Sequence, residues 1–227
     1  MSSKSSIPFT SPRWQRLNEG CFDASDNRLT ITSGPNTDWW RTSFASEPEA
    51  SVNRHSGPVV YIDVPQDETH WKAGVWISGD FTERFQQATL FVGAGDYEAS
   101  NDPWVKAGVE LEHGIQFIGS VVANPYSDWA IQPSPLSIGP GANKLFIEIK
   151  RTGSDLVLSY TIAPANDKDA FHAKSREMTL MREVKGFLAQ GHGGRQHIGL
   201  MVCGPKSEKT RAEFLGFTFE TLTRSEV

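Results

Sequence analysis

Short runs of alternating apolar and polar residues recur along the chain. They include residues 59–64, 72–79, 88–92 and 144–151, and the spacing between successive runs is mostly about ten to fifteen residues. Because side chains alternate between the two faces of a β-strand, each run predicts a strand with one face in the core. Regularly spaced strands without helical patterns between them predict an all-β sandwich or barrel.

The most informative run covers residues 104–110. Its apolar face consists of Val105, Ala107 and Val109, and its other face consists of Trp104, Lys106, Gly108 and Glu110. A sheet face that holds an indole, a cation and an anion side by side is a candidate floor for a ligand groove. An ordinary surface ion pair beside an incidental tryptophan would produce the same pattern.

Other strands carry polar or aromatic side chains on their non-core face. Trp39 and Trp40 are adjacent, so only one of them faces the core of a strand. Gln87 directly precedes the run 88–92, and alternation places it on the polar face of that strand. The strand from residue 197 places His197, Met201 and Cys203 on its outward face. Residues 163–178 are polar and irregular, which predicts a loop that is either passive or able to cover a groove.

Length and composition indicate one large domain. The chain has 227 residues, of which 38% are hydrophobic, and we expect a flexible arm over residues 1–12 followed by a single domain over residues 13–227. The net charge of −5, with scattered Lys and Arg, argues against nucleic acid as a partner. No apolar run is long enough for a signal peptide or a membrane span, so we expect a soluble, cytoplasmic protein without a membrane partner.

Cysteine and histidine usage indicates no metal site. The two cysteines, Cys21 and Cys203, lie at opposite ends of the chain, and the six histidines include no closely spaced pair. We therefore expect two free thiols, no metal and no cofactor.

Several motifs, in their order along the chain, match a known family. They are residues 37–41 (TDWWR), 85–90 (FQQATL), 104–110 (WVKAGVE), 120–122 (SVV), 127–129 (SDW) and 199–205 (GLMVCGP). With these motifs the chain resembles the regulation-of-enolase family, a domain of unknown function with a concanavalin A-like jelly-roll fold. The resemblance implies two stacked antiparallel sheets and a ligand on the concave sheet. Gln86 and Thr89 stand where the family usually has Asp and Gly, which removes a carboxylate from the expected groove.

The first functional hypothesis is the binding of a carbohydrate or another small ligand with polar and apolar parts. Such sites combine aromatic platforms with hydrogen-bonding side chains. The residues predicted to bind the ligand are Trp40, Arg41, Gln87, Trp104, Asp128 and Met201.

The second hypothesis is an enzyme in the same groove, with Lys106, Glu110 and His197 as candidate catalytic residues. A glycosidase needs two carboxyl groups, and Glu110 with Asp128 would supply such a pair. The Glu-x-Asp-x-x-Glu motif of the superfamily's glucanases is absent, so a non-hydrolytic lyase, isomerase or cyclase is favoured over a glycosidase. A third hypothesis is a regulatory domain that binds another protein. A deep pocket would favour the first two hypotheses, and a shallow patch would favour the third.

Overall fold

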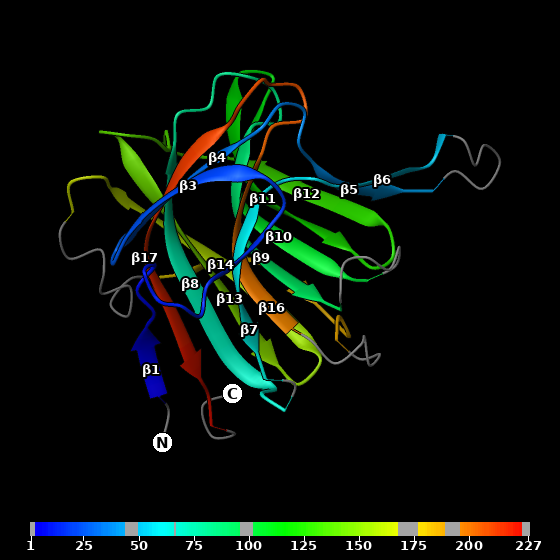
Figure 1. Cartoon of the computed structure of the whole chain (residues 1–227), viewed down its shortest axis with the longest axis vertical. Coiled ribbons are helices and arrows are strands. Elements are labelled where there is room, and N and C mark those ends of the chain that lie inside the picture. The colour runs from blue at the N-terminus through cyan, green and yellow to red at the C-terminus, as the bar shows by residue number, and fades with distance from the viewer. Residues whose placement is uncertain are drawn as a thin grey trace.

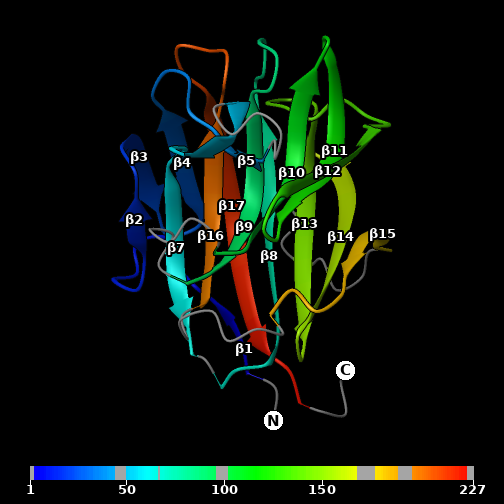
Figure 2. The same ribbon diagram turned by 90° about the vertical axis from the view of Figure 1, so that its right-hand side faces the viewer.

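The protein is a sandwich of two antiparallel sheets, as the alternating pattern predicts (Figures 1 and 2). The computed structural model describes residues 3–43, 50–65, 67–95, 102–167, 177–188 and 196–223. These residues contain seventeen strands and no α-helix. The part of the chain that the structure describes therefore contains no helix with the length and apolar character that crossing a membrane requires.

The first layer is an eight-stranded sheet in the order β15-β14-β13-β8-β17-β4-β3, with β1 added beside β17. Its strands are β1 (Ser3–Ser6), β3 (Gly20–Ser25), β4 (Arg28–Ser33), β8 (His70–Gly79), β13 (Asn143–Thr152), β14 (Asp155–Pro164), β15 (Thr179–Val184) and β17 (Arg211–Thr221).

The second layer is a seven-stranded sheet in the order β12-β11-β10-β9-β16-β7-β2. Its strands are β2 (Gln15–Leu17), β7 (Val59–Val64), β9 (Gln87–Ala94), β10 (Trp104–Glu112), β11 (Ile115–Ala123), β12 (Ser127–Pro133) and β16 (Gln196–Cys203). The two remaining strands, β5 (Trp39–Thr42) and β6 (Val52–His55), pair with each other and extend to one side in Figure 1.

The main core lies between the two sheets, where the apolar face of each strand is buried. Val105, Ala107 and Val109 are fully buried there, as their alternation predicts. Phe217 and Phe219 of the last strand belong to the same core. Burial of this apolar surface is the main favourable contribution to folding.

The N-terminal segment, where a flexible arm is expected over residues 1–12, pairs with the eight-stranded sheet from Ser3 onward. β1 pairs with β17 in register from Ser3 opposite Thr221. Ile7 and Phe9, two positions apart, are buried in the main core. These two apolar side chains share one face and pack on the sandwich.

A second apolar cluster lies on the outward face of the seven-stranded sheet, under the β5–β6 hairpin. It consists of Trp39, Val59, Phe91, Trp104, Val121, Ala123, Met201 and Cys203, with Leu17, Trp40 and Tyr61 partly buried against it. The Trp39 ring makes edge contacts with Phe91 and Trp104, at centroid distances of 4.8 and 5.7 Å. The hairpin thus covers part of this face and leaves the part over Gln87, Glu110 and Trp129 accessible.

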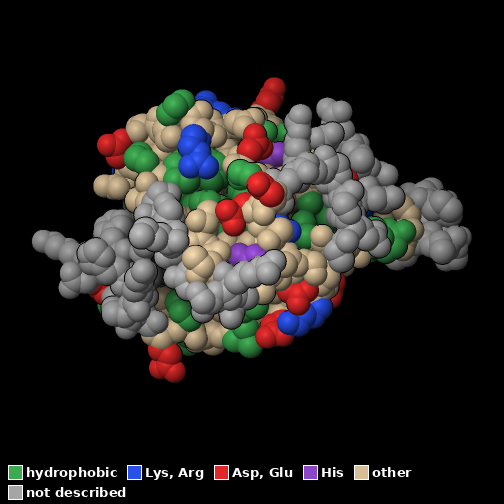
Figure 3. Space-filling model, turned by 90° about the horizontal axis from the view of Figure 1, so that it is seen from below, with side chains coloured by type: hydrophobic (Ala, Val, Ile, Leu, Met, Phe, Trp, Pro, Cys, Tyr) green, Lys and Arg blue, Asp and Glu red, His purple; other side chains and the backbone are tan. Residues whose placement is uncertain are grey.

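Charged side chains of both signs are spread over the surface. Figure 3 shows Asp and Glu side chains interspersed with Lys and Arg on the described part of one face. Cys21 is exposed and Cys203 is buried, and both are free thiols, as expected.

Candidate functional site

The strand register arranges the outward face of the seven-stranded sheet in rows. Residues paired across antiparallel strands share a face, so each row contains side chains from neighbouring strands. The rows over β9 to β12 are Gln87 with Glu110; then Thr89, Gly108, Gly119 and Ile131; then Phe91, Lys106, Val121 and Trp129; then Gly93, Trp104, Ala123 and Ser127.

The second row contains a trough because two of its positions are glycines. A Cβ atom at Gly108 would lie 2.0 Å from the Ala88 carbonyl oxygen, and one at Gly119 would lie 2.4 Å from the Ala130 carbonyl oxygen. Both positions therefore require glycine because backbone atoms approach too closely for a side chain. Lys106 and Glu110 stand on either side of Gly108, with Cα atoms about 13 Å apart by strand rise.

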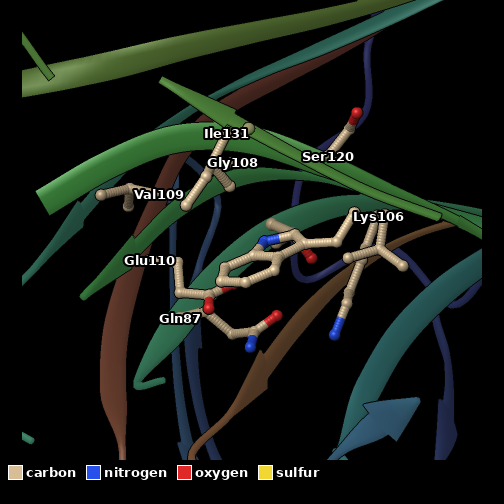
Figure 4. Close-up of a pocket in the computed structure, with 11 residues that line it drawn as sticks. Gln87, Lys106, Gly108, Val109, Glu110, Ser120 and Ile131 are labelled. Carbon is tan, nitrogen blue, oxygen red and sulfur yellow. The ribbon is translucent and has the colours of Figure 1, made fainter. Parts of the chain in front are cut away.

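A pocket of about 280 Å³ opens over these rows. Its lining is formed by Asp38, Trp40, Arg54, Phe85, Gln87, Lys106, Glu110, Val121, Trp129, Pro205 and Lys206. A narrow crevice over Gly108 and Gly119 shares Gln87, Lys106, Glu110, Val121 and Trp129 with this pocket. Figure 4 shows this crevice, with Glu110 and Gln87 next to each other and the Val109 side chain pointing away from them.

The pocket walls are aromatic. Trp40 comes from β5, Phe85 from the loop before β9, and Trp129 from β12. The Phe85 and Trp129 rings meet edge to face, with centroids 6.3 Å apart and an interplanar angle of 74°. Phe85 has a φ of 69°, which is rare for a bulky residue, so the surrounding turn holds it in place.

Gln86, which stands where the family usually has Asp, shapes that turn and does not line the pocket. Its side-chain oxygen accepts hydrogen bonds from the backbone amides of Thr82 and Glu83, at 2.7 and 3.0 Å. Its side-chain amide donates to the carbonyl oxygen of Lys209 at 3.1 Å. An aspartate at this position would therefore act on the turn rather than place a carboxylate in the pocket.

Lys106 is buried on the pocket floor and has two polar partners. Its Nζ donates a hydrogen bond of 2.7 Å to the carbonyl oxygen of Trp39 and lies 3.8 Å from Oδ1 of Asp38. Asp38 also lies 3.8 Å from Nη1 of Arg54. One carboxylate is thus shared between two cations, which offsets the cost of burying the Lys106 charge.

Glu110 has a different environment from Lys106. It is half-buried and has no hydrogen-bond or ion-pair partner among the described residues. Burial raises its pKa from 4.5 to about 7, although the Lys106 charge acts in the opposite direction. Near neutral pH this carboxyl group is therefore able to give up or accept a proton inside the pocket.

Four of the predicted site residues line the pocket together: Trp40, Gln87, Lys106 and Glu110. Trp104 and Met201 instead lie in the second apolar cluster, beneath the hairpin. Arg41 is buried on the opposite side of β5 from Trp40, where its Nη2 donates to the carbonyl oxygen of Asp102 at 2.6 Å.

His197 and Asp128 lie away from the pocket lining. Both ring nitrogens of the buried His197 are hydrogen-bonded, Nδ1 to Oδ1 of Asp63 at 2.7 Å and Nε2 to the carbonyl oxygen of Gly95 at 3.0 Å. Asp128 pairs in register with Val122 and therefore points to the opposite side of β12 from Trp129. Its carboxylate binds Nη2 of Arg182 at 2.5 Å. Glu110 and Asp128 consequently do not face each other as a glycosidase pair.

Seven lining residues escaped the sequence-based prediction: Asp38, Arg54, Phe85, Val121, Trp129, Pro205 and Lys206. Trp129 had a usable signal, because it stands next to Asp128 and alternation assigns the two to opposite faces. Val121 lies in β11 opposite Lys106, so its register places it on the same face. The other five reach the pocket through loops and the hairpin, whose positions depend on tertiary packing. Among the described residues, no cluster of His, Cys, Asp or Glu has the arrangement of a metal site.

Comparison with known proteins identifies the family. Residues 14–222 match the family described as protein of unknown function DUF1349. The chain belongs to this family. A protein named "Regulation of enolase protein 1" from Saccharomyces cerevisiae is 28% identical over 103 residues, which cover 45% of this chain and 46% of that protein. An uncharacterized protein from Emericella nidulans is 29% identical over 179 residues, covering 79% of this chain and 78% of that protein. The resemblance seen in the sequence is thus confirmed.

Solved structures confirm the jelly-roll-like fold of this DUF1349 protein. A functionally unknown protein from Saccharomyces cerevisiae superposes with a TM-score of 0.72 at 19% identity, covering 93% of this chain and 97% of that one. The exoplasmic/lumenal domain of VIP36, in a Ca²⁺/Man₃GlcNAc-bound form, gives a TM-score of 0.58 at 10% identity, covering 98% and 88% of the two chains. A xylan β-1,4-xylosidase from Bacillus halodurans gives 0.58 at 12% identity, covering 86% of this chain and 33% of that one.

Proposed function

We propose that the protein binds a small organic ligand, of the carbohydrate kind, in the pocket between the hairpin and the seven-stranded sheet. The observation that carries this proposal is the convergence of Trp40, Phe85 and Trp129 around a polar floor that includes Gln87 and Glu110. Aromatic rings pack against the C–H faces of such a ligand, while amide and carboxyl groups bond to its hydroxyl edges. The sugar-bound form of a structural neighbour agrees with this use of the fold.

The test is capture of small molecules from a metabolite extract and a glycan mixture by immobilised protein, measured by mass spectrometry. Trp129→Ala removes one aromatic wall. Tyr126→Ala is the matched control, because Tyr126 is an exposed aromatic residue outside the pocket lining. We expect wild type and the control to retain the same ligand and Trp129→Ala to retain it about tenfold less tightly, since burial of an aromatic side chain contributes about 1.5 kcal/mol or more. Equal retention by all three proteins, or no retention by wild type, would contradict the proposal.

A second candidate function is proton transfer to or from the bound ligand, which would make the protein a lyase, isomerase or cyclase. The observation that favours it is Glu110, whose pKa of about 7 lies where a general acid or base works best. The captured ligand, incubated with protein in D₂O, should gain deuterium at a C–H position, and Glu110→Gln should abolish the gain. A ligand that gains no deuterium would contradict proton transfer and leave binding as the function.

The pocket supports both of these functions better than a protein-binding regulatory role. A protein partner needs a broad surface, and standard interfaces bury about 800 Å² on each side. The aromatic residues here instead face one open pocket of about 280 Å³. The name of the yeast relative describes that protein, and the geometry of this pocket gives no separate support for the same role.

A further inference from the structure

Two cationic side chains stand at the pocket wall without a full complement of anions. Arg54 pairs in register with Trp40 and so shares the pocket-facing side of the hairpin with it. Lys206 comes from the β16–β17 loop, and its Nζ lies 5.5 Å from the centroid of the Phe85 ring. Lys206 has no ion-pair partner within the described parts of the chain.

The loop that carries Lys206 is held in place by its own hydrogen bonds. The Ser207 amide donates to the carbonyl oxygen of Gly204 at 3.2 Å, and the Asn36 amide donates to the carbonyl oxygen of Ser207 at 2.9 Å. Ser207 is buried although its neighbour Lys206 is exposed. The ammonium group is therefore presented beside the pocket by an anchored turn.

The charges in the lining leave an excess of positive charge. Lys106, Arg54 and Lys206 supply three cations, whereas Asp38 and Glu110 are the only carboxyl groups that line the described pocket. Asp38 is shared between Lys106 and Arg54. The nearby Glu112 also feels the Lys206 charge, but its hydrogen bonds of 2.6 to 3.0 Å come from Arg84, whose charge it offsets. A positive pocket in a chain with a net charge of −5 concentrates anionic ligands at one place.

Building on the proposed function, we propose that the ligand is a small organic anion whose carboxylate or phosphate group binds between Arg54 and Lys206. Its body would lie between the Trp40 and Trp129 rings, and its far end would approach Glu110. Arginine binds carboxylate and phosphate oxygens through two parallel N–H groups, and lysine adds a point charge. The pocket volume of about 280 Å³ suits a molecule of monosaccharide size, since sites for drug-sized ligands occupy about 300 to 1,000 Å³.

The experiment compares ligands that share one scaffold and differ only in the end group. Glucose, glucuronate and glucose 6-phosphate form one series, and benzyl alcohol, phenylacetate and benzyl phosphate form the other. Binding to the full chain is measured by isothermal titration calorimetry. The test variant is Arg54→Gln/Lys206→Gln. The control variant, Arg13→Gln/Lys209→Gln, changes the net charge equally, and both of its residues are exposed and outside the pocket lining.

We expect an acidic member of at least one series to bind wild type and the control about tenfold more tightly than its neutral counterpart. The test variant should lose this preference. Whichever acid of the series binds more tightly, the carboxylate or the phosphate, shows which of the two groups the site prefers. A neutral member that binds as tightly as its acids, while Trp129→Ala still weakens its binding, would overturn the anion inference and leave the proposed function intact. A preference that the test variant retains would also overturn the inference, and no binding by any member would overturn both.

Discussion

At the scale of single residues, the site depends on two charged side chains of β10 that the fold treats differently. Lys106 is buried but has the Trp39 carbonyl oxygen and Asp38 as partners. Glu110 is half-buried and has no such partner among the described residues. A carboxyl group in this position lowers its burial cost by holding a proton, which is why its pKa rises to about 7.

The raised pKa of Glu110 predicts how stability depends on pH. The folded state binds a proton between pH 4.5 and about 7 that the unfolded state releases, so this contribution to stability is complete below pH 4.5. It is lost as the pH rises through 7, and the loss in the free energy of unfolding amounts to at most about 3 kcal/mol. Denaturant unfolding of wild type and Glu110→Gln from pH 4.5 to 8.5 measures this effect.

Glu110→Gln keeps the shape of the side chain and removes its titration. We therefore expect the variant to gain stability relative to wild type as the pH rises from 5 to 8. Stability curves that stay parallel over this range would show that Glu110 does not carry a raised pKa.

At the scale of the elements, the β5–β6 hairpin has two faces with separate roles. Trp39 is fully buried against Phe91 and Trp104, whereas Trp40 is half-buried and lines the pocket. The sequence predicts that adjacent tryptophans point in opposite directions, and the structure confirms this. Alternation along β5 also places Arg41 with Trp39, which explains why Arg41 is outside the pocket lining.

The two faces of the hairpin predict different effects for two neighbouring substitutions: one mainly on stability, the other mainly on ligand binding. Trp39→Ala should lower the free energy of unfolding by about 3 to 5 kcal/mol, because it leaves a large cavity in the second apolar cluster. Trp40→Ala should lower the free energy of unfolding by only about 1 kcal/mol, and its main effect should be weaker ligand retention. Thermal unfolding together with the capture assay measures both effects, and equal losses of stability in the two variants would contradict this assignment.

The trough in β10 and β11 predicts a strict requirement for glycine. Gly108→Ala would bring a Cβ atom into the Ala88 carbonyl oxygen, and such overpacking typically costs about 1 to 3 kcal/mol. Gly34→Ala is the control, because a Cβ there meets no atom within 4 Å. Chemical denaturation should show a loss of stability for Gly108→Ala and none for Gly34→Ala. A Gly108→Ala protein as stable as wild type would contradict the predicted requirement for glycine.

At the scale of the whole molecule, strand patterns and family resemblance predict the sandwich but only part of the site. Alternation assigns Lys106, Glu110 and Gln87 to the outward face, because the face on which a side chain lies depends only on its position within its own strand. Residues such as Arg54 and Lys206 reach the same pocket from segments about 150 positions apart, through packing that local patterns do not encode. The loop expected over residues 163–178, either passive or able to cover a groove, falls largely on residues 168–176, which lie outside the described residues.

The position of the candidates that lie outside the pocket lining follows from the same limit. Trp104 and Met201 have the predicted outward direction, but the hairpin covers them and makes them part of an apolar cluster. His197 also points outward, and its ring nitrogens are bonded to Asp63 and Gly95. Which part of an outward face stays accessible is decided by the element that packs over it.

Most of these predictions depend on a small molecule that binds beside Trp40 and Trp129. The most direct measurement is the indole N–H region of the nuclear magnetic resonance spectrum, in which the seven tryptophans give separate signals that Trp→Phe variants assign. On addition of the small-molecule fraction eluted from the immobilised protein, the signals of Trp40 and Trp129 should shift, and those of the core residues Trp71 and Trp76 should stay in place. Unchanged Trp40 and Trp129 signals, with that fraction bound, would place the ligand elsewhere and contradict the account.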